Sequence, residues 1–213
     1  MSERELATED EQNLLSQTEE DPACVEDAEQ PHSAPELDPE TIARRDEALS
    51  HVRKFGDPVL RAKAVEVDRF DQSLQAEVAR MGELMDDALG IGLAATQIGI
   101  LHRVIVYRAY ADEQITALIN PVLESRGEEL EAATEGCLSL PGVHVEVERP
   151  AQVRVRAQDP AGKPLVLEAE GLEARVIQHE IDHLDGVLIL DRVSREARKE
   201  AMRELREASA QTV

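Results

Sequence analysis

Two histidines four positions apart, with a glutamate directly after the first, occur in the stretch "IQHEIDHLDG" at residues 177–186. On an α-helix His179 and His183 lie one turn apart on the same face, so both imidazoles can bind one metal ion. Glu180 lies about a quarter-turn away, where its carboxylate can reach a molecule bound to that metal. This pattern is typical of metal-dependent hydrolysis, but two ligands are one fewer than a catalytic site requires.

The third ligand has to come from elsewhere in the chain. One extended form of the motif places a third histidine six residues after the second, but Ile189 occupies that position. Cys137 lies between two turn-prone stretches in "TEGCLSLPG" (134–142) and could supply a thiolate. A thiolate and two imidazoles on a divalent ion leave one coordination position open for water. Taken alone, Cys137 could equally be a buried and inert residue.

A third stretch, "GIGLAATQIG" (90–99), carries glycines and one polar side chain in small apolar surroundings. Gly90, Gly92 and Ala95 match the spacing of a dinucleotide-binding turn, but the expected element before them is a helix and not a strand, which argues against that fold. A buried Gln97 without a partner would cost about 1–3 kcal/mol, so either a ligand or the nearby backbone must bind it.

The elements that must position these residues are predicted from hydrophobic periodicity. Apolar residues repeat every three to four positions in the helices and alternate in the strands, where the valines of "VHVEVE" share one face. Short turns between successive strands favour an antiparallel sheet. The pattern therefore predicts an α+β fold, with antiparallel sheets packed around a central metal-binding helix and with helices at both ends. The expected elements are helices over 72–89, 172–184 and 194–209 and strands over 101–108, 116–124, 143–148, 152–157 and 164–170.

Charge divides the chain into two parts. The formal net charge of the 213 residues is −22, and residues 1–47 hold 16 acidic against 3 basic side chains with almost no apolar periodicity. Such a segment cannot bury enough surface to offset its ordering entropy, so we expect a disordered acidic N-terminal extension over 1–47. Residues 48–213 are then one folded, metal-dependent hydrolase domain.

Several classes of protein are disfavoured. No run of 18 apolar residues indicates a membrane span, and acidic residues stand where a signal peptide needs a basic region, so we expect a cytoplasmic protein. A disulfide between Cys24 and Cys137 is not expected in that reducing compartment. The strong negative charge also argues against sequence-specific binding of nucleic acid.

Together, "GIGLAATQ", "EGCLS" and "QHEIDH", in this order, resemble the three signature motifs of the peptide deformylase family, over roughly residues 50–200. The resemblance implies hydrolytic removal of the formyl group from the N-terminal formyl-methionine of nascent polypeptides by a metal-bound hydroxide, with release of formate. "CLSLPGVHVEVER" carries no insertion and is similar to the compact-loop variant of the family.

The resemblance also implies roles for individual residues. Cys137, His179 and His183 would bind the metal, generally iron(II) in the family, with nickel, cobalt or zinc able to replace it. Glu180 would act as the general acid–base. The residues expected to contact the substrate are Gln97 and the backbone N–H of Leu138 at the oxyanion, Gly92 along the substrate backbone, and Ile91, Leu172 and Val176 around the methionine side chain.

Three features remain open at this stage. Glu135 and Arg149 could pair and orient the loop that carries Cys137, or they could be solvated charges. His144 stands where some relatives have an arginine that contacts substrate, which puts that contact in doubt. The C-terminal helix mixes arginines with glutamates, as a solvated face does, but could also dock the enzyme at the ribosome.

Two other functions compete with deformylation. A metallopeptidase would use the same water and base against an internal amide, but it needs a cleft open on both sides of the metal. A structural metal site, or a binding module for chain N-termini, would need a fourth protein ligand and has no use for Glu180.

Overall fold

The computed structural model describes the backbone of residues 37–211 and the side chains up to Glu207. Cys24 and residues 1–36 of the predicted extension lie outside the described residues, so the disorder expected there stays a prediction. No helix of the described part is long and apolar enough to span a membrane.

Two antiparallel sheets make up the strand content. The larger sheet has five strands in the order β1-β2-β3-β6-β7, and β4 and β5 form a separate hairpin. The strands are β1 (Gly92–Ala94), β2 (Val104–Tyr107), β3 (Thr116–Arg126), β4 (Leu130–Cys137), β5 (Leu140–Pro150), β6 (Gln152–Gln158) and β7 (Pro164–Glu170). The described residues also form three short 3₁₀ helices: η1 (Pro58–Arg61), η2 (Ala95–Ile98) and η3 (Ile189–Asp191).

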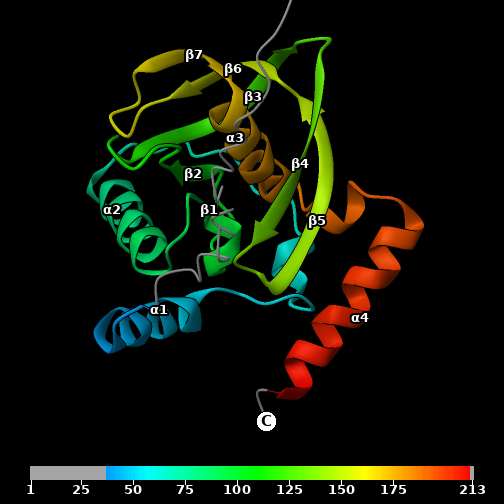
Figure 1. The fold of residues 1–213 in the computed structure, drawn as a ribbon. Coiled ribbons are helices and arrows are strands. Elements are labelled where there is room, and N and C mark those ends of the chain that lie inside the picture. Colours follow the sequence, from blue (N-terminus) through cyan, green and yellow to red (C-terminus); the bar gives the residue numbers. More distant parts are fainter. Residues whose placement is uncertain (1–36, 212–213) are drawn as a thin grey trace, which may run out of the picture. The chain divides into compact units, whose positions relative to one another are not determined.

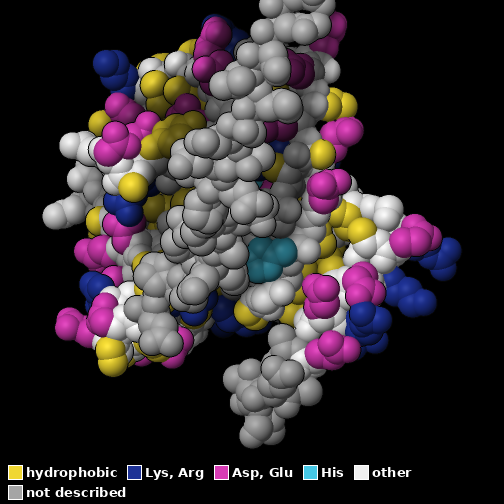
Figure 2. Space-filling model, in the orientation of Figure 1, with side chains coloured by type: hydrophobic (Ala, Val, Ile, Leu, Met, Phe, Trp, Pro, Cys, Tyr) yellow, Lys and Arg dark blue, Asp and Glu magenta, His cyan; other side chains and the backbone are white. Residues whose placement is uncertain are grey.

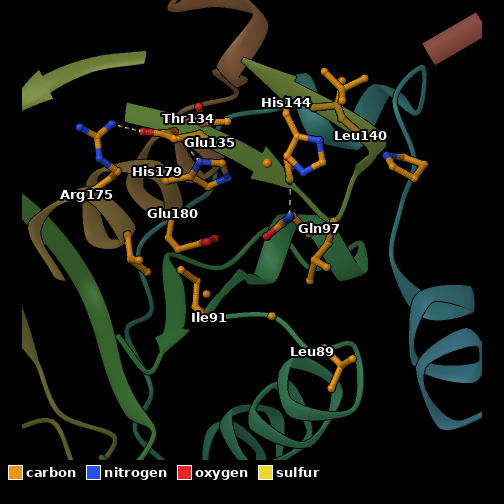
Figure 3. Close-up of a pocket in the computed structure, with 18 of the residues that line it drawn as sticks. Leu89, Ile91, Gln97, Thr134, Glu135, Leu140, His144, Arg175, His179 and Glu180 are labelled. Atoms are coloured by element: carbon orange, nitrogen blue, oxygen red, sulfur yellow. Dashed lines mark hydrogen bonds and ion pairs between the residues drawn. The ribbon is translucent and has the colours of Figure 1, made fainter. Parts of the chain in front are cut away.

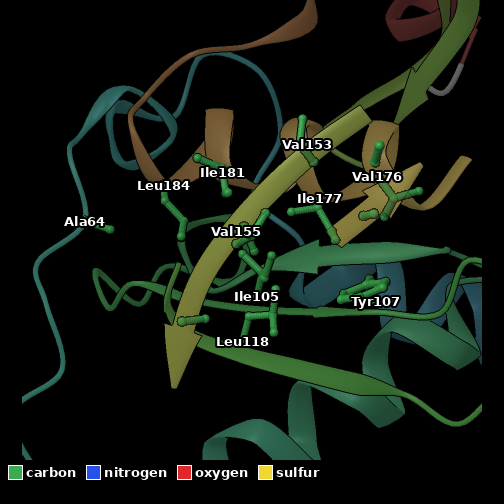
Figure 4. Packing of buried hydrophobic residues seen from close by; sticks show 14 residues of the cluster. Ala64, Ile105, Tyr107, Leu118, Val153, Val155, Val176, Ile177, Ile181 and Leu184 are labelled. Carbon is green, nitrogen blue, oxygen red and sulfur yellow. The ribbon is translucent and has the colours of Figure 1, made fainter. Parts of the chain in front are cut away.

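The central helix α3 (Gly171–Leu184) lies between the five-stranded sheet and the β4–β5 hairpin (Figure 1). Its apolar side chains Ile177, Ile181 and Leu184 pack against the sheet face that carries Ile105 and Val155 (Figure 4). Burial of each such side chain stabilises the fold by about 1.5–3 kcal/mol. Every residue of α3 from 174 to 184 is buried, so its polar side chains must find partners inside the protein.

Helix α2 (Gln72–Asp87) covers the opposite face of the sheet. Alternation along β2 turns Val104 and Val106 toward Met81 and Met85 of α2, while Ile105 turns toward α3. The predicted fold class is confirmed: helices and antiparallel sheets surround one buried helix.

The structure differs from the prediction in the strand region. β4 was not predicted because its sequence, "LEAATEGC", lacks the alternation of apolar residues that marks a half-buried strand. β5 pairs with β4 and not with β6, so the chain passes from the hairpin to the large sheet at Pro150–Gln152. Pro121 stands within a register shift between Ile119 and Val122, and it therefore bulges β3 without ending it.

Helix α1 (Pro39–His51) corrects the predicted boundary of the extension at residue 47. The carboxylate of Asp38 caps it by accepting hydrogen bonds from the N–H groups of Glu40 and Thr41, and Pro39 is its first residue. Of its side chains only Ala48 is buried. Because the helix is otherwise mostly polar and charged, its sequence lacks the apolar period by which a helix is predicted. Val52, directly after it, is also buried. The folded part therefore begins about ten residues earlier than predicted.

Helix α4 (Arg195–Gln211) follows Ser194, whose hydroxyl accepts a hydrogen bond from the N–H of Ala197 at 3.1 Å, as expected for an N-cap. Ala201 and Leu205 are buried among residues of the hairpin, whereas Ala197 is exposed. Figure 2 shows acidic and basic side chains mixed along the outer face of this helix.

Candidate metal centre

The structure brings three potential metal ligands together from two distant parts of the chain. Donor atoms of Cys137, His179 and His183 all lie within 4.8 Å of one another. Cys137 Sγ lies 3.3 Å from His183 Nε2. Among the described residues no fourth cysteine, histidine or carboxylate joins the cluster. A ligand set of one thiolate and two imidazoles fits a divalent ion such as iron, zinc, nickel or cobalt with a position left open.

Secondary structure sets this arrangement. Cys137 is the last residue of β4, where the ladder with β5 shifts register after Gly136. The two histidines occupy successive turns of α3, and their rings stand 5.0 Å apart between centroids in an edge-on arrangement. A rigid hairpin thus presents the sulfur to a rigid helix.

Electrostatics favour a thiolate at this position. Burial alone would raise the pKa of the Cys137 thiol, but the imidazoles of His183 and His179 hold that pKa well below its ordinary value. Burial would lower the pKa of His179, but hydrogen bonds to Cys137 and Glu135 raise it well above its ordinary value. The centre therefore stabilises a thiolate on Cys137 and an imidazolium on His179. A metal cation bound by the same atoms would displace the imidazolium proton.

Glu135 supports the first histidine from behind. Its carboxylate accepts hydrogen bonds from Arg149 at 2.6 and 2.9 Å and from Arg175 at 2.8 Å. It also contacts His179 Nδ1 at 3.0 Å, which leaves Nε2 of that ring free for a metal. Burial would raise the pKa of Glu135, but the hydrogen bonds with His179 and Arg149 lower it to about 2. The Glu135–Arg149 pair, left open by the sequence, is a buried ion pair.

Two members of this ionic cluster were not found by sequence reasoning. Arg175 also donates to the backbone carbonyls of Val147 and Glu131. Asp182 accepts hydrogen bonds from Arg149 at 2.9 Å and from Arg192. Both lie on α3. The signal that could have found them is that a helix buried on all sides must pair its charged side chains inside the protein.

Glu180 differs from Glu135 in having no such partners. It is 4% exposed, and its Oε2 atom makes no hydrogen bond among the described residues. Burial raises the pKa of this carboxyl, and the nearby imidazoles oppose that effect only in part. A Cβ atom added at Gly92 would lie 2.3 Å from Glu180 Oε1, so only glycine at that position leaves room for the carboxylate.

Gln97 lies in η2 beside the sulfur. Its Oε1 accepts a hydrogen bond from the N–H of Ala94 at 2.8 Å, and its Nε2 donates to Ser139 Oγ at 3.3 Å. The same nitrogen lies 3.7 Å from Cys137 Sγ. The backbone N–H of Ala94 therefore satisfies the amide oxygen of Gln97. The amide nitrogen is directed at residues 137–139, where Leu138 follows Cys137.

A cavity of about 490 Å³ opens in front of these groups. Figure 3 shows Glu180 of α3, Gln97 of η2 and Ile91 of the segment before β1 directed into this space. Val176 is buried, whereas Ile91 and Leu172 remain partly exposed at 48% and 39%. The predicted methionine-pocket residues thus all line one cavity, together with Gly92 and Leu138.

Further residues of the cavity wall come from β5 and α1, and those from α1 were not expected. His144 lines it from β5, opposite Gly136, where an added Cβ would lie 3.3 Å from the imidazole ring. Arg45 and Leu49 line it from α1, the helix that the sequence analysis assigned largely to the extension.

Comparison with known proteins gives a consistent result. Residues 49–199 match the family model described as polypeptide deformylase. A peptide deformylase of Parafrankia sp. (strain EAN1pec) is 44% identical over 161 residues, which cover 76% of this chain and 87% of that protein. Peptide deformylase 1 of Corynebacterium efficiens is 48% identical over 153 residues, covering 71% of this chain and 90% of that protein.

Solved structures give the same match in three dimensions. The crystal structure of a peptide deformylase from Synechococcus elongatus in complex with actinonin superposes with a TM-score of 0.70 at 43% identity, covering 74% of this chain and 86% of that one. A peptide deformylase from Legionella pneumophila superposes with a TM-score of 0.72 at 38% identity, covering 76% of this chain and 95% of that one.

Proposed function

The chain belongs to the peptide deformylase family, and from that premise we propose that it hydrolyses the formyl amide of N-terminal formyl-methionine at the centre formed by Cys137, His179 and His183. Deformylases remove the N-formyl group from nascent peptides, so this chain is a hydrolase of a linear amide. The observation that carries the assignment is a three-donor cluster beside an unpartnered, buried carboxylate at the wall of one cavity.

The donor set supports a resident divalent ion, for which we propose iron(II). When bound, such an ion acts as a Lewis acid that lowers the pKa of a water molecule and polarises the formyl carbonyl. Glu135 and its arginines hold the His179 ring with Nδ1 engaged, which leaves its other nitrogen for the metal.

Glu180 is the proton carrier in this proposal. Its carboxylate takes a proton from the attacking water and returns it to the departing amine, so that formate and a free α-amino group are formed. A raised pKa suits this role, because the carboxyl must both accept and release a proton near neutral pH. The absence of an ion pair at Oε2 among the described residues leaves that oxygen available.

The developing oxyanion is held by the side-chain amide of Gln97 and the N–H of Leu138. Support comes from the 3.7 Å between Gln97 Nε2 and Cys137 Sγ, which keeps the amide beside the ligand cluster. Gly92 admits both the Glu180 carboxylate and the substrate backbone. Val176, Ile91 and Leu172 enclose the methionine side chain.

A direct assay separates this function from that of a metallopeptidase. Enzyme purified without oxygen and analysed for metal is given formyl-Met-Ala-Ser, and formate release is measured. The same preparation is then given an N-blocked peptide with only internal amides. We expect stoichiometric metal and formate release from the first peptide alone; cleavage of the second peptide without formate release would assign the site to peptidase chemistry.

We also propose that the enzyme acts in the cytoplasm and that α4 contributes to contact with the ribosome. The mixed charges on the exposed face of α4 support the contact with the ribosome. Since α4 buries Ala201 and Leu205, the test replaces the exposed residues Lys199 and Arg206 with glutamine and leaves the helix in place. Unchanged co-sedimentation with ribosomes at low salt would remove this part of the proposal.

A further inference from the structure

Helix α1 forms part of the active-site wall although it lies almost entirely outside the segment that matches the family. That match begins at residue 49, whereas α1 begins at Pro39. Arg45 and Leu49 line the same cavity as Cys137 and Glu180. Arg45 is exposed, so it stands where the cavity opens to solvent. This chain therefore adds a wall to the substrate cavity.

Hydrogen bonds fix the position of α1 relative to the segments that carry Gln97 and Cys137. Ala48 and Val52 are buried at 2% and 4% exposure, which anchors the end of the helix. The N–H of Arg53 donates to the carbonyl of Gln97 at 2.7 Å, and the N–H of Phe55 donates to the carbonyl of Ser139 at 2.9 Å. Because the backbone after α1 hydrogen-bonds to both of these segments, the helix has a defined position relative to the site.

Arg45 carries a positive charge that the described residues leave uncompensated. The other arginine of the cavity wall, Arg175, is paired with Glu135. Arg45 makes no hydrogen bond or ion pair within residues 37–207, whereas its neighbour Arg44 donates to Thr41 Oγ1 at 3.4 Å. An unpaired guanidinium is a suitable donor for a carboxylate, which it can bind through two hydrogen bonds.

A second cation reinforces this local charge. Lys54 Nζ donates to the carbonyl of Leu138 at 3.2 Å, next to the proposed oxyanion site. Arg45 and Lys54 thus place two cations on the α1 side of the site, in a protein whose net charge of −22 would otherwise repel acidic peptides.

We propose that α1 provides a subsite for carboxylate side chains on the substrate, with Arg45 as the residue that binds them. The inference rests on the proposed function and adds a preference to it: formyl-methionyl chains with Asp or Glu among the residues next to methionine are deformylated faster than their neutral counterparts. Arg45 is an exposed residue of the cavity wall and does not belong to the donor cluster, so it selects substrates and takes no part in the chemistry.

The test compares amidated tetrapeptides that extend formyl-Met-Ala-Ser by one residue and carry either Glu or Gln at the second, third or fourth position. Amidation removes the terminal carboxylate, which would otherwise mask the effect. For the full-length, metal-loaded enzyme at low salt we expect kcat/KM to favour Glu over Gln about two- to fivefold at one of these positions, mainly through KM. This ratio falls toward one in 0.5 M salt, at which the Debye length shrinks to about 4 Å.

Two variants of α1 form a matched pair. Arg45→Gln should abolish the Glu-over-Gln ratio, and Arg45→Glu should reverse it so that a Lys peptide is favoured over the Gln peptide. Arg44→Gln removes the same charge one residue away, outside the cavity wall, and should keep the wild-type ratio. Calorimetric titration with the unformylated peptides measures the same preference without turnover.

The outcomes separate the inference from the function on which it rests. Equal Glu-to-Gln ratios in the wild type and Arg45→Gln, with formate released from both peptides, would overturn the subsite and leave deformylation intact. Loss of the ratio in Arg44→Gln as well would assign the effect to general charge and also overturn it. No formate from any peptide would overturn the proposed function, and the subsite with it.

Discussion

Buried charge differs between the two sides of helix α3: it is paired behind His179 and unpaired in front of it. Behind His179, the carboxylate of Glu135 is bound by two arginines and the imidazole itself, and the cluster extends through Arg149 to Asp182. In front, Glu180 is equally buried but has an oxygen without a partner among the described residues. Paired charges hold geometry because breaking them is costly, whereas an unpaired carboxyl is free to exchange a proton. The difference predicts which substitutions lower stability and which lower activity.

The largest effect is expected on the cavity side. Glu180→Gln keeps the size of the side chain but removes the proton acceptor, so kcat should fall by about 10²- to 10⁴-fold. The free energy of unfolding and the bound metal should change little, because no ion pair is lost. Formate-release kinetics, denaturant unfolding and metal analysis test this. A strong loss of stability would show that Glu180 has a structural role and would break the contrast.

On the paired side, Glu135→Ala leaves Arg149 and Arg175 buried without their acceptor. The free energy of unfolding should fall by about 3–5 kcal/mol, as for other buried pairs that lose one partner. Metal affinity should also fall, by about 10- to 100-fold, because the His179 ring loses its support. Denaturant unfolding and competition with a chelator measure the two effects. Normal stability with normal metal affinity would contradict the proposed support of His179.

Gln97 lies between the two sides, since its oxygen is held by the backbone and its nitrogen faces the ligand loop. Gln97→Ala should lower kcat by roughly 100-fold, the usual cost of one oxyanion donor, with metal content unchanged. An unaltered rate would remove Gln97 from the oxyanion site.

The smallest effect is expected for an ion pair near the surface, away from the metal. Asp191 is paired with Arg61 and Arg198, and its side chain is 27% exposed. Burial would raise the pKa of Asp191. Its hydrogen bond with Arg61, the strongest of the opposing interactions, holds that pKa below its ordinary value of 3.8. Asp191→Asn should therefore cost about 1 kcal/mol or less at neutral pH.

The pH dependence of that cost follows from the direction of the shift. A lowered pKa in the folded state means that the stabilisation is fully present above pH 3.8 and is lost as pH falls further below it. The difference in unfolding free energy between the wild type and Asp191→Asn should thus shrink in acid. A difference that stayed constant down to the acid transition would show that the charge of Asp191 contributes nothing.

Much of the fold was predictable because its signals are local. The spacing of His179 and His183 places both rings on one helical face whatever the rest of the chain does. Alternating valines in β5 and β6 likewise predicted two half-buried strands, and the helix expected over 194–209 begins within one residue of α4. In each case the period of the backbone itself relates the sequence to the structure.

Only the tertiary structure decided what lies against these elements. β4 forms because it pairs with β5, and its own sequence carries too little apolar alternation to predict it. Arg175 and Asp182 join the ionic cluster behind the proposed metal ligand His179 because α3 is buried on all sides. Arg45 lines the cavity because α1 packs beside α2 and the backbone after α1 hydrogen-bonds to Gln97 and Ser139. These relations depend on contacts between residues far apart in the sequence, and no local period encodes such contacts.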